Sequence, residues 1–127
     1  MKKLTIITLL LVLIAGIGYA KKKPEGKIEF KETVWDFGTI KSGTSSTHEF
    51  EFTNIGDGNL TIRSATADCG CTKVSAPEEP FAPGKKGKIK VTYGAVGMPQ
   101  SFEKTITVRT NGSPGKVYLK IRGIVKK

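Results

Sequence analysis

From Ile28 onward, short runs in which every second residue is apolar dominate this chain and constrain its fold more than any other feature. The clearest runs are residues 47–54, 59–66, 88–93, 102–110 and 116–122. In each run the alternate positions are polar, as in an antiparallel strand with one buried face. No stretch has apolar residues at the three- and four-residue spacing of an ordinary helix. The pattern predicts an all-β chain.

Segments that favour turns separate these runs. They are 54–58 (NIGDG), 82–84 (APG) and 111–115 (NGSPG). Apolar residues at even positions 28 and 30 and at odd positions 35 and 37 add one or two short N-terminal strands, with a bend or bulge where the parity changes. Seven to eight short strands over about 100 residues are typical of an immunoglobulin-like antiparallel β-sandwich. An open barrel is the alternative.

The first 20 residues have the pattern of a signal peptide. Lys2 and Lys3 precede an apolar run of 15 residues, and the small residues Gly18 and Ala20 fit a cleavage site after Ala20. A membrane-spanning helix needs about 20 apolar residues, so we expect cleavage rather than a retained anchor, which is the alternative. Residues 21–27 are predicted to be a flexible charged tether, followed by one domain over residues 28–127. We therefore expect a periplasmic or secreted protein that meets the membrane only during export.

The chain is strongly basic, with 21 Lys and Arg against 11 Asp and Glu and a net charge of +10. Removal of residues 1–20 takes away two lysines and no acids, so the net charge becomes 19 minus 11, or +8. This charge favours acidic partners such as envelope surfaces or polysaccharides. The lysines are spread along the chain without an arginine-rich or aromatic-interleaved stretch, so no specific nucleic-acid binding is predicted. We expect a monomer whose partner is an envelope protein or a glycan.

Cys69 and Cys71 are the only cysteines, and their Cys-Gly-Cys arrangement is compatible with a redox couple, a soft-metal clip or a local staple. Residues two apart in an extended strand have Cα atoms about 6.5 to 7 Å apart, which is at the upper limit for a disulfide. A bridge between Cys69 and Cys71 therefore requires a bend in the chain. We expect Gly70 to be the hinge of this bend. Such a bridge closes three residues, and chain entropy assigns it roughly 1.6 kcal/mol, against about 3 kcal/mol for a fifteen-residue loop. A bridge between these cysteines is therefore more plausible as an exchangeable bond than as a structural one, although an inert pair is the leading interpretation.

Metal binding and catalysis have weaker support. A closed zinc site needs four ligands, and the candidates beyond the two cysteines are His48 and Met98. His48 has the parity of Phe50, so we expect it to be a hydrogen-bonded histidine at the edge of the core. One histidine supplies no hydrolase triad, and residues 84–88 (GKKGK) lack the spacing of a phosphate loop. No cofactor and no enzymatic activity are predicted.

Five segments follow one another along the chain as landmarks: 35–40 (WDFGTI), 48–54 (HEFEFTN), 69–72 (CGCT), 81–84 (FAPG) and 119–123 (LKIRG). In this order they resemble the bacterial domain-of-unknown-function family numbered 1573, an Ig-like group related to the ASPM/SPD-2/Hydin modules. The resemblance covers residues 28 to 125 and implies a seven- to eight-stranded sandwich and export. The chain departs from the family's pattern at Ile55 and Asp68. The family has no established reaction, so the resemblance transfers the fold and the Cys-Gly-Cys motif only.

These observations favour an exported, non-catalytic interaction module of the bacterial envelope. The alternative is a thiol-redox or soft-metal (Cu or Zn) accessory domain that uses Cys69 and Cys71 with Gly70 as the hinge.

Overall fold

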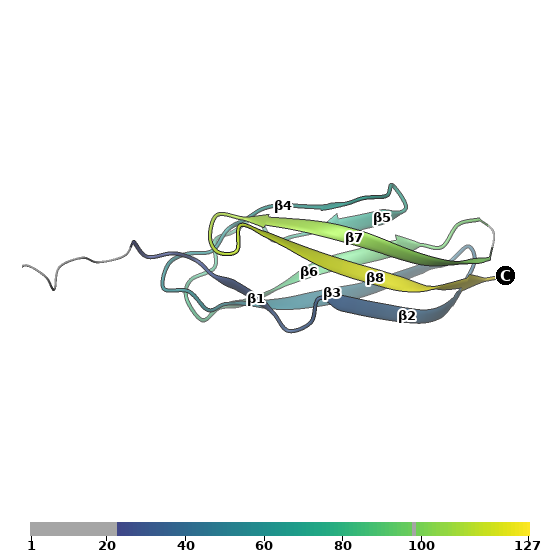
Figure 1. Cartoon of the computed structure of the whole chain (residues 1–127), viewed down its shortest axis with the longest axis horizontal. Coiled ribbons are helices and arrows are strands. Elements are labelled where there is room, and N and C mark those ends of the chain that lie inside the picture. Colours follow the sequence, from purple (N-terminus) through teal and green to yellow (C-terminus); the bar gives the residue numbers. More distant parts are fainter. Residues whose placement is uncertain (1–22, 98) are drawn as a thin grey trace, which may run out of the picture.

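The computed structural model describes residues 23–97 and 99–127, which form eight β-strands and no helix (Figure 1). The strands are β1 (Ile28–Phe30), β2 (Val34–Lys41), β3 (Ser45–Asn54), β4 (Ile62–Ala67), β5 (Thr72–Ser75), β6 (Lys86–Gly94), β7 (Gln100–Thr110) and β8 (Lys116–Lys126). Each of the five alternating runs overlaps a strand. The prediction of an all-β chain is therefore confirmed.

Two four-stranded sheets make up the domain, in the orders β1-β3-β6-β5 and β2-β8-β7-β4. All neighbouring strands are antiparallel except β2 and β8, which run parallel. The sheets pack face to face along an elongated body (Figure 1). This is the predicted immunoglobulin-like sandwich rather than an open barrel.

The strand registers turn the sequence alternation into one buried and one solvated face for each sheet. On β3 and β6, Phe50 lies opposite Ile89, and both side chains are fully buried. The next outward pair along these strands is Glu51 opposite Lys88. The largest fully buried side chains come from both sheets and from the segment just before β4: Phe50, Phe52, Leu60, Ile89, Ile106, Leu119 and Ile121. Each contributes about 1.5–3 kcal/mol through burial, so this shared layer holds the two sheets together.

Near the N-terminus the apolar residues change from even to odd positions. The predicted bend or bulge is not the main cause of this change. β1 ends at Phe30 in one sheet, and β2 begins at Val34 in the other sheet. Even positions therefore face the core in β1, whereas the odd position Phe37 packs against it in β2, because the chain changes sheets between them. A bulge is also present, but it lies inside β2, between Asp36 and Thr39.

Strand β5 was not predicted as a strand. Its sequence, TKVS, contains a single large apolar residue, Val74, and it pairs with β6 alone at the edge of its sheet. The predicted run over 59–66 is also divided, since Leu60 forms an isolated bridge with Phe81 and β4 begins at Ile62. A short edge strand buries little surface, so the alternation that marks the other strands is weak here.

Buried Asn54 connects three segments at one end of the sandwich. Its Oδ1 accepts hydrogen bonds from the backbone N–H groups of Lys27 (3.1 Å) and Gly56 (3.0 Å). Its Nδ2 donates to the carbonyls of Gly58 (2.8 Å) and Phe81 (2.9 Å). All four hydrogen-bonding positions of this amide are therefore used.

These bonds place residues 24–27 against the domain, where a flexible tether had been expected. Asp57 N–H and Gly58 N–H donate to the Glu25 carbonyl, and Gly26 is buried. The folded contacts therefore begin before Ile28. The expected signal peptide, residues 1–20, lies outside the described residues, and no helix among those described is long and apolar enough to cross a membrane.

Candidate functional site

The Cys-Gly-Cys motif lies where the chain leaves one sheet and enters the other. β4 ends at Ala67 in one sheet, and β5 begins at Thr72 in the second sheet. Backbone bonds hold both sides of this crossing, because Asp68 N–H donates to the Thr105 carbonyl and Gly94 N–H donates to the Cys71 carbonyl. The motif is therefore fixed between β7 and β6.

A disulfide joins Cys69 and Cys71, whose Cα atoms are 5.3 Å apart. This separation is shorter than in an extended strand and lies within the usual range for a disulfide, so the chain does bend here. The N–H of Thr72 donates to the Cys69 carbonyl across the turn (3.2 Å), and the N–H of Cys71 faces the Cys69 sulfur at 3.1 Å. Both cysteines are half-buried, and Cys71 packs against the core.

Gly70 lies at the bend, as the sequence suggested, but the bend makes little use of glycine's conformational freedom. Its φ is outside the left-handed region, and a Cβ built at this position would have no heavy atom within 4 Å. The turn can therefore hold a residue with a side chain. The reason for expecting a glycine hinge, access to conformations closed to other residues, does not apply in this structure.

His48 lies apart from the cysteines, on the middle of β3. Its Nε2 is 2.6 Å from a carboxylate oxygen of Glu32, and its ring stacks on Trp35 with centroids 3.9 Å apart and planes 4° apart. The edge of the His48 ring also meets Phe50. This is the hydrogen-bonded histidine expected at the edge of the core.

The candidate metal ligands are not brought together. Cys69 and Cys71 form a disulfide with each other. His48 is hydrogen-bonded to Glu32, and its ring packs against two other aromatic rings. Among residues 23–97 and 99–127, no three His, Cys, Asp or Glu side chains are grouped so that they could hold a metal ion. Met98 lies outside the described residues.

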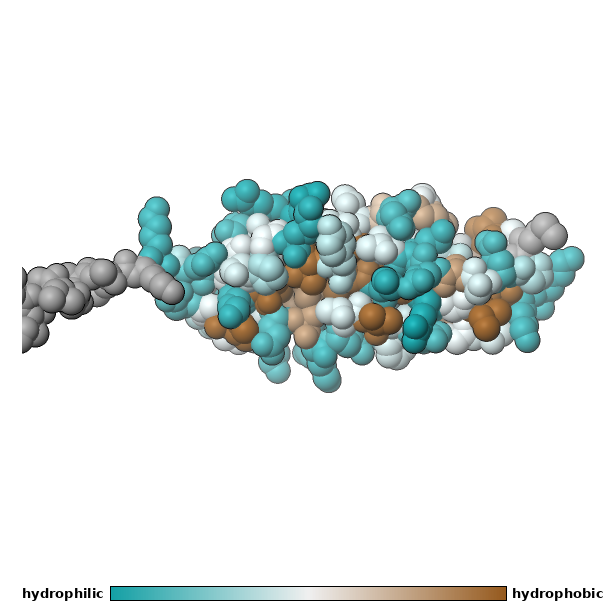
Figure 2. Space-filling view, in the orientation of Figure 1, coloured by the Kyte–Doolittle hydropathy of each residue, from teal (hydrophilic) through white to brown (hydrophobic). Residues whose placement is uncertain are grey.

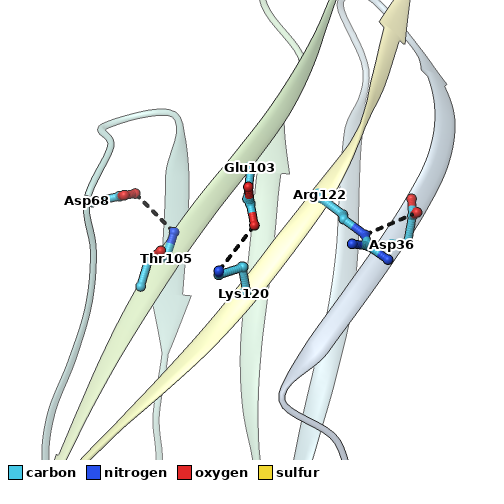
Figure 3. A network of polar contacts seen from close by, with 6 residues as sticks. All are labelled: Asp36, Asp68, Glu103, Thr105, Lys120 and Arg122. Atoms are coloured by element: carbon cyan, nitrogen blue, oxygen red, sulfur yellow. Dashed lines mark hydrogen bonds and ion pairs between the residues drawn. The ribbon is translucent and has the colours of Figure 1, made fainter.

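Sequence reasoning did not single out the outward side of the β2-β8-β7-β4 sheet, which we call the β8 face. Polar contacts cross it from strand to strand (Figure 3). Arg122 on β8 pairs with Asp36 on β2 at 3.3 Å, and Lys120 on β8 pairs with Glu103 on β7 at 3.2 Å. Beyond them, the N–H of Thr105 donates to Asp68 at 3.3 Å. These contacts order charged side chains from four separate parts of the chain on one surface.

A shallow groove of about 510 Å³ runs over part of the β8 face. Its charged lining consists of Asp36, Glu103 and Arg122, and Ile124 adds an apolar wall. Both carboxylates already pair with cations across the strands. The groove therefore offers fixed, paired charges, an arrangement that suits binding better than proton transfer.

Exposed apolar side chains lie among these charges. Val34, Tyr118 and Ile124 are 44%, 57% and 46% exposed, and their registers place them on the outward side of β2 and β8. Figure 2 shows this side of the molecule as a mainly hydrophilic surface with separate hydrophobic spots. The alternation in residues 116–122 indicates which side chains of β8 point outward. The residues of β2 and β7 that lie beside them can be identified only once the order of the strands in the sheet is known.

Comparison with protein families gives a match to a family described as a protein of unknown function, DUF1573, over residues 28–125. The chain belongs to the DUF1573 family. The resemblance of the five sequence segments to this family is thus confirmed. No curated protein matches the chain.

Solved structures similar to this DUF1573 chain share its fold at low sequence identity. A protein of unknown function from Porphyromonas gingivalis W83 has a TM-score of 0.70 and 18% identity, with 83% of this chain and 50% of that chain covered. The ASH/PapD-like domain 7 of human CEP192 has a TM-score of 0.68 and 13% identity, covering 86% and 92%. The VesB protease of Vibrio cholerae has a TM-score of 0.62 and 16% identity, covering 80% and 32%.

The chain therefore spans about half of the Porphyromonas gingivalis protein and a third of the protease. These likenesses show that the chain has an Ig-like fold. They carry no activity to this chain.

Proposed function

We propose that this DUF1573 chain is an exported binding module of the bacterial envelope that acts without catalytic turnover. The signal-peptide pattern of residues 1–20 supports export. The fold supports the role of a module, since β-sandwiches of this type present broad sheet faces and loops to partners.

The β8 face is the observation that carries the proposal. Among the described residues, the exposed large hydrophobic side chains are Val34, Trp35, Ile55, Val96, Tyr118 and Ile124. Half of them lie on this one face, next to the ion pairs of Arg122 and Lys120. Apolar and aromatic groups surrounded by polar side chains are typical of protein interaction surfaces.

A capture experiment with the full chain tests this proposal. The folded chain is immobilised and exposed to a bacterial envelope extract, and the retained component is quantified. A test variant carries Tyr118→Thr and Ile124→Thr on the β8 face. A control variant carries Ile55→Thr and Val96→Thr, which also remove exposed apolar side chains but from loops outside this face.

We expect the test variant to lose most of the retained component and the control variant to keep it. Equal retention by all three proteins would contradict a role for the β8 face. Repeated failure of the folded wild-type chain to retain anything would contradict the binding function itself.

The disulfide between Cys69 and Cys71 supports a second candidate, a thiol-redox accessory role. A bridge that closes so few residues adds little stability, so its exchange costs the fold little. Alkylation of free thiols across a graded glutathione couple, read by mass, tests this role. A bond that opens near the potential of the compartment supports it, whereas a bond that never opens, or thiols that stay reduced throughout, rejects it. Stoichiometric copper or zinc in the reduced sample would instead favour the soft-metal role.

A further inference from the structure

One cross-strand pair on the β8 face departs from the charge pairing in the rest of the sandwich. Where two charged residues lie directly opposite each other on antiparallel strands, a carboxylate usually faces a cation. The pairs of this kind are Glu49 with Lys90, Glu51 with Lys88 and Glu103 with Arg122. Arg109 on β7 instead lies opposite Lys116 on β8. Like charges in this position repel each other and destabilise the sheet.

A third cation lies beside this pair. The register of β4 shifts between Ile62 and Ser64, and Ser64 is opposite Arg109, so exposed Arg63 occupies the bulge on the next strand. The ion pairs formed by residues 23–97 and 99–127 join His48 to Glu32, Lys120 to Glu103 and Arg122 to Asp36. None of them involves Arg63, Arg109 or Lys116. Three cations on three neighbouring strands therefore share one end of the β8 face without a carboxylate partner.

An aromatic ring completes this group. Tyr118 is 57% exposed and lies two residues from Lys116 on the same face of β8. The Lys116 Nζ is 5.9 Å from the centroid of the Tyr118 ring. An exposed ring next to cations provides a flat apolar surface and charge attraction at the same place.

From this arrangement we infer that Arg63, Arg109, Lys116 and Tyr118 form a binding site for a carboxylate-bearing polysaccharide. The inference rests on the proposed binding function and assigns the chemical class of its partner. Arginine guanidinium groups pair well with carboxylates, and the apolar side of a sugar ring can pack on Tyr118. An anionic ligand would also remove the repulsion between Arg109 and Lys116.

The same features favour a polysaccharide over single-stranded nucleic acid. Sequence-independent nucleic-acid grooves use several aromatic side chains on which successive bases stack. Tyr118 is the one exposed aromatic side chain on the described part of the β8 face. A single ring beside a group of cations suits one sugar unit with its acidic group.

Equilibrium binding of the full chain to polygalacturonate and alginate tests the inference, with neutral dextran as the uncharged polymer. The test variant is Arg109→Thr with Lys116→Thr. The control variant is Lys73→Thr with Lys86→Thr, which removes the same charge from the outward side of the other sheet. Both control lysines lie opposite threonines, so their loss leaves no carboxylate unpaired. Thermal unfolding of each variant confirms that it is folded.

We expect the two acidic polymers to bind and dextran not to bind. The test variant should bind the acidic polymers about tenfold more weakly, and the control variant less than about twofold more weakly. Tyr118→Thr should weaken binding about threefold while its dependence on salt is unchanged, because the ring carries no charge.

Equal losses in the test and control variants would overturn the site, since net charge alone would then explain binding. Tighter binding of single-stranded DNA or of phosphatidylglycerol vesicles than of the polysaccharides would overturn the assigned class. Absence of binding to both acidic polymers would also overturn it. If the chain still retains an envelope component in the capture experiment, that failure leaves the proposed binding function intact.

Discussion

Replacement of Asn54 by leucine should destabilise the domain far more than the same change at another asparagine. Asn54 is fully buried, and its amide bonds to backbone groups of Lys27, Gly56, Gly58 and Phe81. Leucine has a similar volume but can make none of these bonds. The change therefore isolates the hydrogen bonds that hold the chain before β1 and the 54–58 loop.

The expected loss of stability follows from the backbone groups that lose their hydrogen bond to Asn54. The Phe81 carbonyl still accepts a bond from Leu60 N–H, whereas the N–H groups of Lys27 and Gly56 and the carbonyl of Gly58 lose their partner. An unsatisfied buried group costs about 1–3 kcal/mol, and these groups are partly buried. We therefore expect the free energy of unfolding to fall by about 3–5 kcal/mol, a large part of the 5–15 kcal/mol that is usual for a domain.

Urea denaturation of the full chain, followed by the fluorescence of its one tryptophan, Trp35, measures this loss. For a slope of about 1.3 kcal/mol per M, the midpoint should fall by about 2–4 M. Asn111→Leu is the control, because exposed Asn111 accepts a bond from Thr61 N–H that water can replace. We expect it to cost less than about 1 kcal/mol. Similar midpoint shifts in the two variants would refute the reasoning.

Three further variants test other parts of the structure. Gly87→Ala should lower the free energy of unfolding by about 1–3 kcal/mol, because the added Cβ would lie 2.8 Å from the Phe81 ring and closer still to Phe52. Thermal unfolding measures this loss, and an unchanged melting temperature would contradict the packing around Gly87. Gly70→Ala should leave the disulfide and the stability within about 0.5 kcal/mol of the wild type, as its Cβ meets open space, and free thiols detected by alkylation would show the opposite. Cys69→Ser with Cys71→Ser should cost no more than about 2 kcal/mol by urea denaturation, since the bridge closes a short loop. An unfolded double variant would show that the bridge is a structural requirement.

The fold was predictable where burial imposes alternation over several residues. β3, β6, β7 and β8 each have one mostly buried row of side chains, so their sequences alternate clearly. β5 escaped prediction because Val74 alone marks it, and its position depends on pairing with β6. The change of sheet between Phe30 and Val34 left a parity signal, but local sequence does not distinguish a crossing from a bulge.

The candidate sites were predictable only where their residues are close in sequence. The bend at Cys69 and Cys71 followed from the spacing of two cysteines. The repulsive pair of Arg109 and Lys116 was accessible in principle, because the 111–115 turn sets the register of the hairpin. The pairing of Arg122 with Asp36 was not accessible, since it depends on β2 lying parallel to β8 at the edge of the sheet.

The most direct test of the proposed function is amide chemical-shift mapping of the isotope-labelled full chain. The ligand is the envelope component eluted from the capture experiment, and its mass is measured before and after incubation to detect turnover. We predict shifts confined to the outward side of β2, β8, β7 and β4, including Tyr118, Arg122 and Arg63, with an unchanged ligand. Shifts centred on Cys69 and Cys71, or chemical conversion of the ligand, would contradict a non-catalytic binding module that acts through the β8 face.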